Sequence, residues 1–193
     1  MPLNIPNTLT LLRILLIPVI FIVYLLHTTW SNEVATVIFV LAAITDWLDG
    51  YLARRLDQYS AFGEFLDPVA DKLIVATALV LLATDGALHE QLFSFTMSTA
   101  AIAIIIGREI AISALREWMA ELGKRASVAV SYVGKVKTTV QMTAISMLLY
   151  QAPLFGLPIV EIGEALLYVA AALTLYSMII YLKAAWPVLS EQE

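Results

Sequence analysis

The chain has 193 residues, of which 61% are hydrophobic and 14% charged, and its mean hydropathy is +0.86. A soluble domain carries about 25% charged residues, so this composition excludes an ordinary water-soluble globular protein. The absence of cysteine and the presence of only two histidines, His27 and His89, argue against a disulfide scaffold, a thiol nucleophile and a zinc site. An integral membrane protein remains, and within its net charge of −5 the position of each charge is more informative than the sum.

Six apolar stretches are long enough to cross a bilayer, which takes about 20 mostly apolar residues. In chain order they are 8–27, 34–55, 61–83, 92–115, 127–150 and 159–182. Turn-forming residues separate them, and residues 2–7 form a short segment that we expect to lie along the membrane interface. The sequence therefore predicts an all-α, polytopic membrane protein with six transmembrane helices in a single domain over residues 1–193.

The basic residues predict the orientation of these helices. With six spans, all eleven Lys and Arg residues lie at or near one side of the membrane. The three loops on the opposite side, 27–33, 84–91 and 151–158, contain neither Lys nor Arg. Because basic loops remain in the cytoplasm, we predict that both chain termini are cytoplasmic.

The second predicted span carries two aspartates near its cytoplasmic end. Asp46 and Asp49 share a helix face about 140° wide with Gly50, Ala53 and Arg54. Charged residues within a membrane segment are costly and usually face a polar cavity. This face therefore indicates a functional site, with room beside the small residues for a bulky ligand.

The third predicted span carries two more aspartates, Asp67 and Asp71, which follow Gly63 at intervals of four residues. Residues four apart lie on one side of a helix. Since the two spans are joined by a short link and run antiparallel, they can direct all four carboxylates toward one point.

Four crowded carboxylates repel one another and take up protons unless cations join them. Ligands that are all oxygen favour Mg²⁺ or Mn²⁺, and paired divalent ions serve in-line phosphoryl displacement. An alternative is a proton- or cation-conducting acidic cluster in a transporter. The outer halves of the spans, such as 14–23 and 73–83, are nearly uncharged, which argues against a conducting path.

The spacing of these residues resembles the signature of the CDP-alcohol phosphotransferases. Its eight positions here are Asp46, Asp49, Gly50, Ala53, Arg54, Gly63, Asp67 and Asp71. The resemblance covers essentially the whole chain, least clearly at its C-terminal end. Three further stretches, 4–13, 108–117 and 128–138, are similar to bacterial family members that use glycerol 3-phosphate.

The resemblance implies a reaction. The phosphatidyl group of CDP-diacylglycerol passes to the 1-hydroxyl of sn-glycerol 3-phosphate, which gives phosphatidylglycerophosphate and CMP in phospholipid biosynthesis. It also implies a homodimer in the bacterial inner membrane, with the active site at the cytoplasmic face and no nucleic-acid partner.

The resemblance further implies a role for each aspartate. Asp46, Asp49 and Asp67 would bind one divalent ion, and Asp46, Asp67 and Asp71 the other, with Mg²⁺ and Mn²⁺ both open. Asp71 would also act as the general base toward the acceptor hydroxyl, which becomes more acidic beside a metal ion.

For the lipid donor, the resemblance indicates Gly50, where the nucleotide approaches the backbone closely, and Arg54, which would bind the diphosphate. The alternative for Arg54 is a simple positive charge on the cytoplasmic side. The remaining expected donor contacts are Pro6, Asn7, Thr10, Ala53, Ser60 and Gly63.

The acceptor carries a phosphate of its own and needs a basic pocket. Arg108 lies deep in the fourth span, and an ion pair with Glu109 is disfavoured because successive helix residues face about 100° apart. Lys135 and Lys137 are about 200° apart on the fifth span, and we select Lys135. Arg116 is a third candidate.

Two kinds of alternative remain. A family member could use another acceptor, such as serine, inositol phosphate or phosphatidylglycerol, since the acceptor is chosen outside the eight signature positions. A protein of another class could use the aspartates for cation or proton transport.

Overall fold

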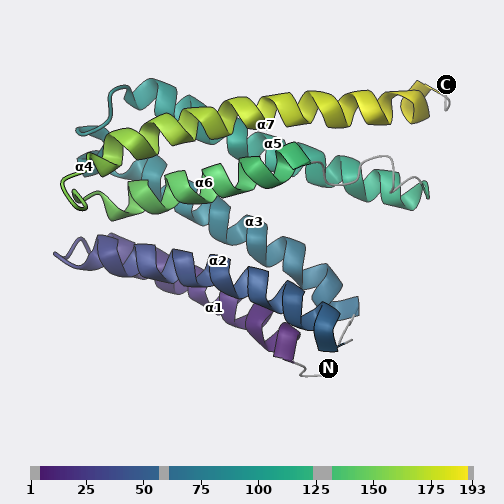
Figure 1. Ribbon diagram of the computed structural model, residues 1–193, viewed down its shortest axis with the longest axis horizontal. Helices are drawn as coiled ribbons and strands as arrows, with labels where there is room; N and C mark the ends of the chain where they lie inside the picture. The colour runs from purple at the N-terminus through teal and green to yellow at the C-terminus, as the bar shows by residue number, and fades with distance from the viewer. Residues whose placement is uncertain (1–4, 57–60, 124–131, 191–193) are drawn as a thin grey trace.

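The computed structural model describes residues 5–56, 61–123 and 132–190. Nearly all of these residues are helical, and the only β-type pairing among them is an isolated bridge between Leu154 and Leu157. The helices are α1 (Ile5–Leu25), α2 (Ser31–Leu56), α3 (Ala61–Thr84), α4 (Gly86–His89), α5 (Phe95–Glu121), α6 (Tyr132–Tyr150) and α7 (Ile159–Ser190) (Figure 1). The predicted all-α fold is confirmed.

The long helices coincide with the six predicted stretches, but several of their ends differ. α1 begins at Ile5, so residues 5–7 are part of the first helix and not of a separate interfacial segment, while residues 2–4 lie outside the described residues. α5 continues past the predicted end at 115 because residues 116–121 are good helix formers. It ends just before Gly123, which has a φ of +69°.

The long helices form two groups of three. α1 packs along both α2 and α3, which contact each other little, so that α1 lies between them. In the second group α5 and α6 both pack along α7. Contacts of α2 with α6, and of α3 with α5 and α6, join the groups (Figure 1).

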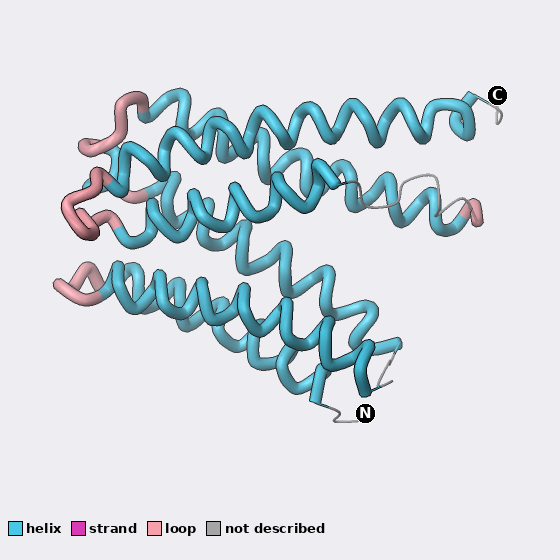
Figure 2. Tube along the Cα trace, viewed as in Figure 1, coloured by secondary structure: helices cyan, strands magenta, loops and turns pink. Residues whose placement is uncertain are grey.

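The two ends of the bundle differ. The segments that connect α1 to α2, α3 to α5 and α6 to α7 gather at one end, which we call the loop end (Figure 2). The start of α1 and the end of α7 both lie at the other end, the terminal end, on opposite sides of the bundle (Figure 1). The first and the last described helices therefore have their outer ends at the same end of the bundle.

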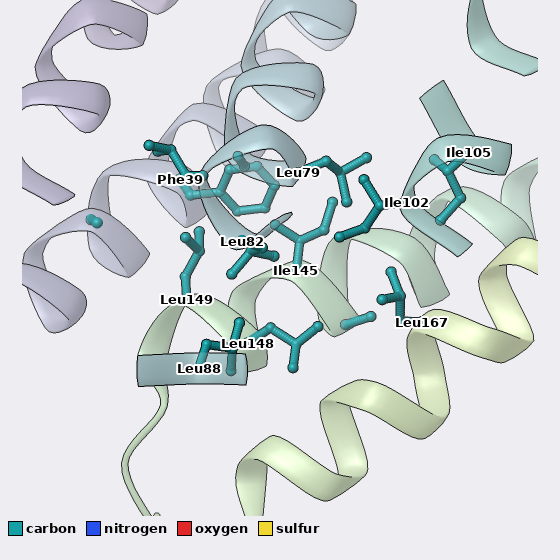
Figure 3. Packing of buried hydrophobic residues seen from close by; sticks show 14 of the residues in the cluster. Phe39, Leu79, Leu82, Leu88, Ile102, Ile105, Ile145, Leu148, Leu149 and Leu167 are labelled. Atoms are coloured by element: carbon teal, nitrogen blue, oxygen red, sulfur yellow. The ribbon is translucent and has the colours of Figure 1, made fainter. Parts of the chain in front are cut away.

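A hydrophobic core joins the two groups at mid-height and toward the loop end. Phe39 of α2 lies beside Leu79 and Leu82 of α3, and Ile145 of α6 and Leu167 of α7 belong to the same cluster (Figure 3). Each of these side chains is at most 1% exposed. Burying a large apolar side chain stabilises the fold by about 1.5–3 kcal/mol, so this half of the bundle is firmly packed.

The outer surface of the bundle is also apolar. Exposed leucine, isoleucine, valine and phenylalanine side chains occur along most of the long helices. Among the described residues, three helical segments are long and apolar enough to cross a membrane, namely Asn7–Leu25, Phe95–Glu121 and Ile159–Pro187. Surfaces of this kind are stable against lipid and not against water.

Asp85 fastens the loop end between the two helix groups. Its carboxylate accepts hydrogen bonds from the backbone N–H of Ala87 and Leu88, at 2.9 and 3.1 Å, and so caps α4. It also accepts from the hydroxyl of Tyr24 at 2.5 Å and from the side-chain amide of Gln151 at 2.7 Å. One buried carboxylate therefore connects α1, α4 and the end of α6.

Glu164 fastens the other side of the loop end. This buried α7 carboxylate accepts from the backbone N–H of Phe93 at 2.8 Å and of Ser94 at 3.1 Å, and from the Ser98 hydroxyl at 2.9 Å. The hydroxyl of Tyr168 donates to the same carboxylate. These bonds attach the start of α5 to α7.

Candidate active site

The four aspartates come together in the half of the bundle toward the terminal end. α2 supplies Asp46 and Asp49, and α3 supplies Asp67 and Asp71. Each carboxylate has an oxygen within 4.0 Å of one and the same side chain, which belongs to α1 and not to either of these helices.

That side chain is Arg13, and its guanidinium lies in the middle of the aspartates. Nη1 donates to Asp46 Oδ1 at 2.9 Å and also contacts Asp71. Nη2 contacts Asp49 and lies 3.7 Å from Asp67 Oδ1. Arg13 is 1% exposed, so its charge is compensated almost entirely by these carboxylates.

Thr10, one turn before Arg13, completes the contacts from α1. Its hydroxyl donates to Asp67 Oδ1 at 2.6 Å and lies 3.5 Å from Asp49 Oδ2. Arg13 and Thr10 occupy one face of α1, and this face lies between α2 and α3. The position of α1 between the two aspartate helices is therefore what brings the cluster together.

The four carboxylates differ in exposure. The Asp49 side chain is 4% exposed, whereas those of Asp46, Asp67 and Asp71 are 43–45% exposed. Three of the four side chains thus keep surface that an arriving cation can reach. The donor set is entirely carboxylate oxygen, which suits Mg²⁺ or Mn²⁺.

The carboxylates are spread around the guanidinium. Within the part of the chain that the structure describes, no three acidic or histidine side chains are grouped closely enough to hold a metal ion as they stand. The residues fit a divalent metal site in their chemistry and convergence. They would have to move inward to form one.

The residues expected to bind the lipid donor are only partly described. Gly50, Ala53 and Arg54 belong to α2 and continue the helix beyond Asp49, and Pro6 belongs to α1. Ser60 lies outside the described residues. Asn7 and Thr10 are buried on α1, as Gly63 is at the start of α3.

A second polar cluster lies among α5, α6 and α7. The Arg108 guanidinium, 8% exposed, donates to the Ser177 hydroxyl at 3.0 Å and lies 3.4 Å from Glu109 Oε1. The Lys137 ammonium donates to the same Glu109 oxygen. Although Arg108 and Glu109 leave the helix in different directions, their side chains are long enough to meet, contrary to the sequence argument.

Tyr181 of α7 extends this cluster toward the terminal end. Its ring centre lies 5.4 Å from the Arg108 guanidinium carbon and 5.3 Å from that of Arg116. Both distances are typical of cation–π contacts. The ring therefore holds two of the three predicted acceptor-binding residues side by side.

The structure does not bring Lys135 to this cluster. Lys135 is exposed, whereas Lys137 is 4% exposed and faces α5. The sequence established that the two lysines point in different directions, and the packing of α6 against α7 decides that Lys137 is the one that faces inward. The choice of Lys135 over Lys137 was therefore wrong in direction, and sequence reasoning did not select Ser177 or Tyr181, which show no motif of their own.

Comparison with known proteins agrees with the motif. The family model described as CDP-alcohol phosphatidyltransferase matches residues 3–176. Curated proteins from Shigella flexneri serotype 5b (strain 8401) and Escherichia coli (strain K12) are each 54% identical to the chain over 185 residues, which is 96% of both chains. Both carry the name CDP-diacylglycerol–glycerol-3-phosphate 3-phosphatidyltransferase.

Proposed function

The chain belongs to the CDP-alcohol phosphatidyltransferase family, and from this we propose that it transfers the phosphatidyl group of CDP-diacylglycerol to sn-glycerol 3-phosphate. The products are phosphatidylglycerophosphate and CMP. The observation that carries the proposal is the convergence of four carboxylates from α2 and α3, three of them accessible, in a bundle with an apolar outer surface.

We assign the aspartates to two divalent ions. Asp46, Asp49 and Asp67 would hold one ion, and Asp46, Asp67 and Asp71 the other, as the family signature implies. Bound there, Mg²⁺ or Mn²⁺ would neutralise the carboxylates and the donor diphosphate and make the acceptor hydroxyl more acidic.

Asp71 accepts the proton of the acceptor. The acceptor oxygen forms a bond to the phosphorus of the phosphatidyl group, the bond from that phosphorus to the bridging oxygen of CMP breaks, and CMP leaves with this oxygen. The Asp71 side chain is 43% exposed, so the hydroxyl can approach it. The signature contains no Cys, His or Lys that could serve as a covalent nucleophile, which favours direct in-line attack.

An apolar groove of 420 Å³ between α2 and α6 is suited to the donor's acyl chains. It is lined by Val40, Ala43, Ile44, Met142, Thr143 and Ser146. By helical periodicity Gly50 and Arg54 continue the α2 face of Val40 and Ala43 toward the terminal end. A lipid with its chains in this groove would thus place its diphosphate beside Gly50 and Arg54.

For the acceptor phosphate we propose the cluster that contains Arg108 and Arg116. Lys137 takes the phosphate-binding role that the sequence analysis gave to Lys135. The two arginines share the Tyr181 ring, and Lys137 reaches the carboxylate beside Arg108. A phosphate that replaces Glu109 as the partner of Lys137 and Arg108 would gain charge-assisted hydrogen bonds.

We further propose that all six long helices cross a bacterial inner membrane as a homodimer. α2, α3 and α6 carry the aspartates and lysines proposed for the site, and these charges distinguish them from the three apolar segments described above. The terminal end, which bears the basic residues, would face the cytoplasm. That side supplies the soluble acceptor.

Acceptor selectivity tests the proposed function. The purified protein in detergent is incubated with CDP-diacylglycerol, Mg²⁺ and one acceptor at a time, and CMP release is measured. The acceptors compared are glycerol 3-phosphate, serine, inositol phosphate, phosphatidylglycerol and free glycerol. We expect release with glycerol 3-phosphate only. Equal CMP release with serine or free glycerol would contradict the assignment of glycerol 3-phosphate as the acceptor. No CMP release with any acceptor would contradict the proposed phosphatidyl transfer.

A further inference from the structure

Arg13 is the only charged residue of α1. An arginine inside an apolar helix is costly unless it has a partner of opposite charge. Here it has four, all of them from other helices and 33–58 residues away in the chain. The residue is therefore part of the aspartate site, although no signature position contains it.

The guanidinium contacts the same oxygens that a divalent ion would need. Asp46 Oδ1 lies 2.9 Å from Nη1, and the carboxylates of Asp49 and Asp71 are also in contact with Nη atoms. One guanidinium neutralises a single negative charge out of four. Two divalent ions would neutralise all four carboxylates. Their positive charges would also repel the positively charged guanidinium, because the ions would lie so close to it.

The binding of Arg13 within the cluster is also incomplete. Among the described residues, its buried Nε atom has no hydrogen-bond partner. A buried donor without a partner destabilises that arrangement. The guanidinium is therefore held mainly by its charge. A cation of higher charge at the same carboxylates would weaken the interaction between the guanidinium and the aspartates.

We propose that Arg13 is the exchangeable counterion of the aspartate site. Its guanidinium holds the four carboxylates around itself when divalent ions are scarce, and it leaves them when the ions bind and draw the carboxylates inward. Arg13 and the metal ions thus exclude each other. This inference rests on the metal site proposed above.

The test is the affinity for Mn²⁺, measured by electron paramagnetic resonance on the purified protein without substrates. Arg13→Gln removes the competing charge, and Lys183→Gln removes an exposed charge of α7 as the matched control. We expect Arg13→Gln to bind Mn²⁺ more tightly, by a factor within the range of about 5 to 150 typical of linked sites. Lys183→Gln should bind as the unchanged protein does.

Thermal unfolding gives a second readout. In EDTA, Arg13→Gln should unfold at a lower temperature than the unchanged protein, because four carboxylates then repel one another without compensation. Saturating Mn²⁺ should raise its unfolding temperature by more than it raises that of the unchanged protein. Methylguanidinium should restore part of the stability in EDTA and weaken Mn²⁺ binding, whereas tetramethylammonium at equal concentration should do neither.

The outcomes separate the two proposals. If the unchanged protein binds no Mn²⁺, the proposed metal site is wrong. If it binds Mn²⁺ and Arg13→Gln binds no more tightly, the exchange is wrong and the metal site stands. Should Arg13→Gln fail to fold, Arg13→Lys keeps the charge but has a single ammonium for four carboxylates. The Arg13→Lys variant should bind Mn²⁺ more tightly than the unchanged protein. Equal or weaker binding would contradict the proposed exchange between Arg13 and the metal ions.

Discussion

The Lys137 ammonium on α6 donates a hydrogen bond to the Glu109 carboxylate on α5, and Arg108 lies 3.4 Å from the same carboxylate oxygen. Two buried cations thus share one anion. The cluster has a surplus of positive charge in a half-dry setting, which is the environment that an anionic ligand requires.

This arrangement distinguishes two lysines on the same helix. Lys137→Ala should lower kcat/KM for glycerol 3-phosphate by roughly 30- to several-thousand-fold, which corresponds to the loss of about 2–5 kcal/mol for a buried charged partner. Lys135→Ala, the matched control, should change it less than about threefold because an exposed charge is well screened. Steady-state kinetics with varied acceptor measures both. A larger loss for Lys135→Ala would restore the lysine first expected from the sequence.

Arg108 and Arg54 should separate the two substrates. Arg108→Ala should raise the KM for glycerol 3-phosphate and leave that for CDP-diacylglycerol nearly unchanged, whereas Arg54→Ala should do the reverse. Both KM values are measured in each variant, with thermal unfolding in detergent to verify folding. If Arg108→Ala weakens both substrates equally, the proposed acceptor pocket is wrong.

Asp85 should make stability depend on pH. Burial by itself would raise the pKa of Asp85, but hydrogen bonds from Tyr24, Gln151 and the backbone N–H groups of Leu88 and Ala87 hold the pKa below its ordinary value. A carboxyl whose pKa is lower in the folded state stabilises the fold fully above its unfolded pKa of about 3.9. That stabilisation is lost as the pH falls through the lower, folded pKa.

Asp85→Asn should therefore unfold more easily at neutral pH, by about 1.5–3 kcal/mol for hydrogen bonds to a charged group. Its deficit should shrink as the pH falls below about 4. Thermal unfolding from pH 7 down to the acid limit measures this, with exposed Glu90→Gln as the control. A deficit that stays constant over the whole range would show that the charge of Asp85 is not what fastens the loop end.

The proposed topology is testable with single cysteines because the chain has none of its own. Glu90→Cys lies exposed at the loop end, and Glu121→Cys lies exposed at the end of α5. A membrane-impermeant maleimide should label Glu90→Cys only from outside the cytoplasm and Glu121→Cys only from the cytoplasmic side. The opposite pattern would contradict the proposed orientation, and labelling of both from one side would contradict the crossing of the membrane by α5.

Helix periodicity was sufficient to predict much of this molecule. The six long helices lie on the six stretches that the sequence predicts, and the spacing of the four aspartates predicts their convergence because it places them on one face of each helix. The longer ends of α5 and α7 were missed because the apolar pattern stops before the helix-forming residues do.

Contacts between distant parts of the chain could not be predicted in the same way. Nothing local to α1 indicates that it lies between α2 and α3, so the place of Arg13 among the aspartates was not expected. The choice of Lys137 over Lys135 depends on how α6 packs. Asp85 and Glu164 have partners 61–71 residues away, which no motif relates to them.

We propose that the aspartate cluster catalyses metal-dependent phosphatidyl transfer to glycerol 3-phosphate. The test is mass spectrometry of the lipid that the purified protein forms from CDP-diacylglycerol and glycerol 3-phosphate, in Mg²⁺ and in excess EDTA. The proteins compared are the unchanged protein, Asp67→Asn and Glu161→Gln, which changes an exposed residue as the control. We predict phosphatidylglycerophosphate and CMP in equal amounts with Mg²⁺, none in EDTA or with Asp67→Asn, and normal amounts with Glu161→Gln. Full product formation in EDTA, or by Asp67→Asn, would show that the aspartates do not catalyse a metal-dependent transfer.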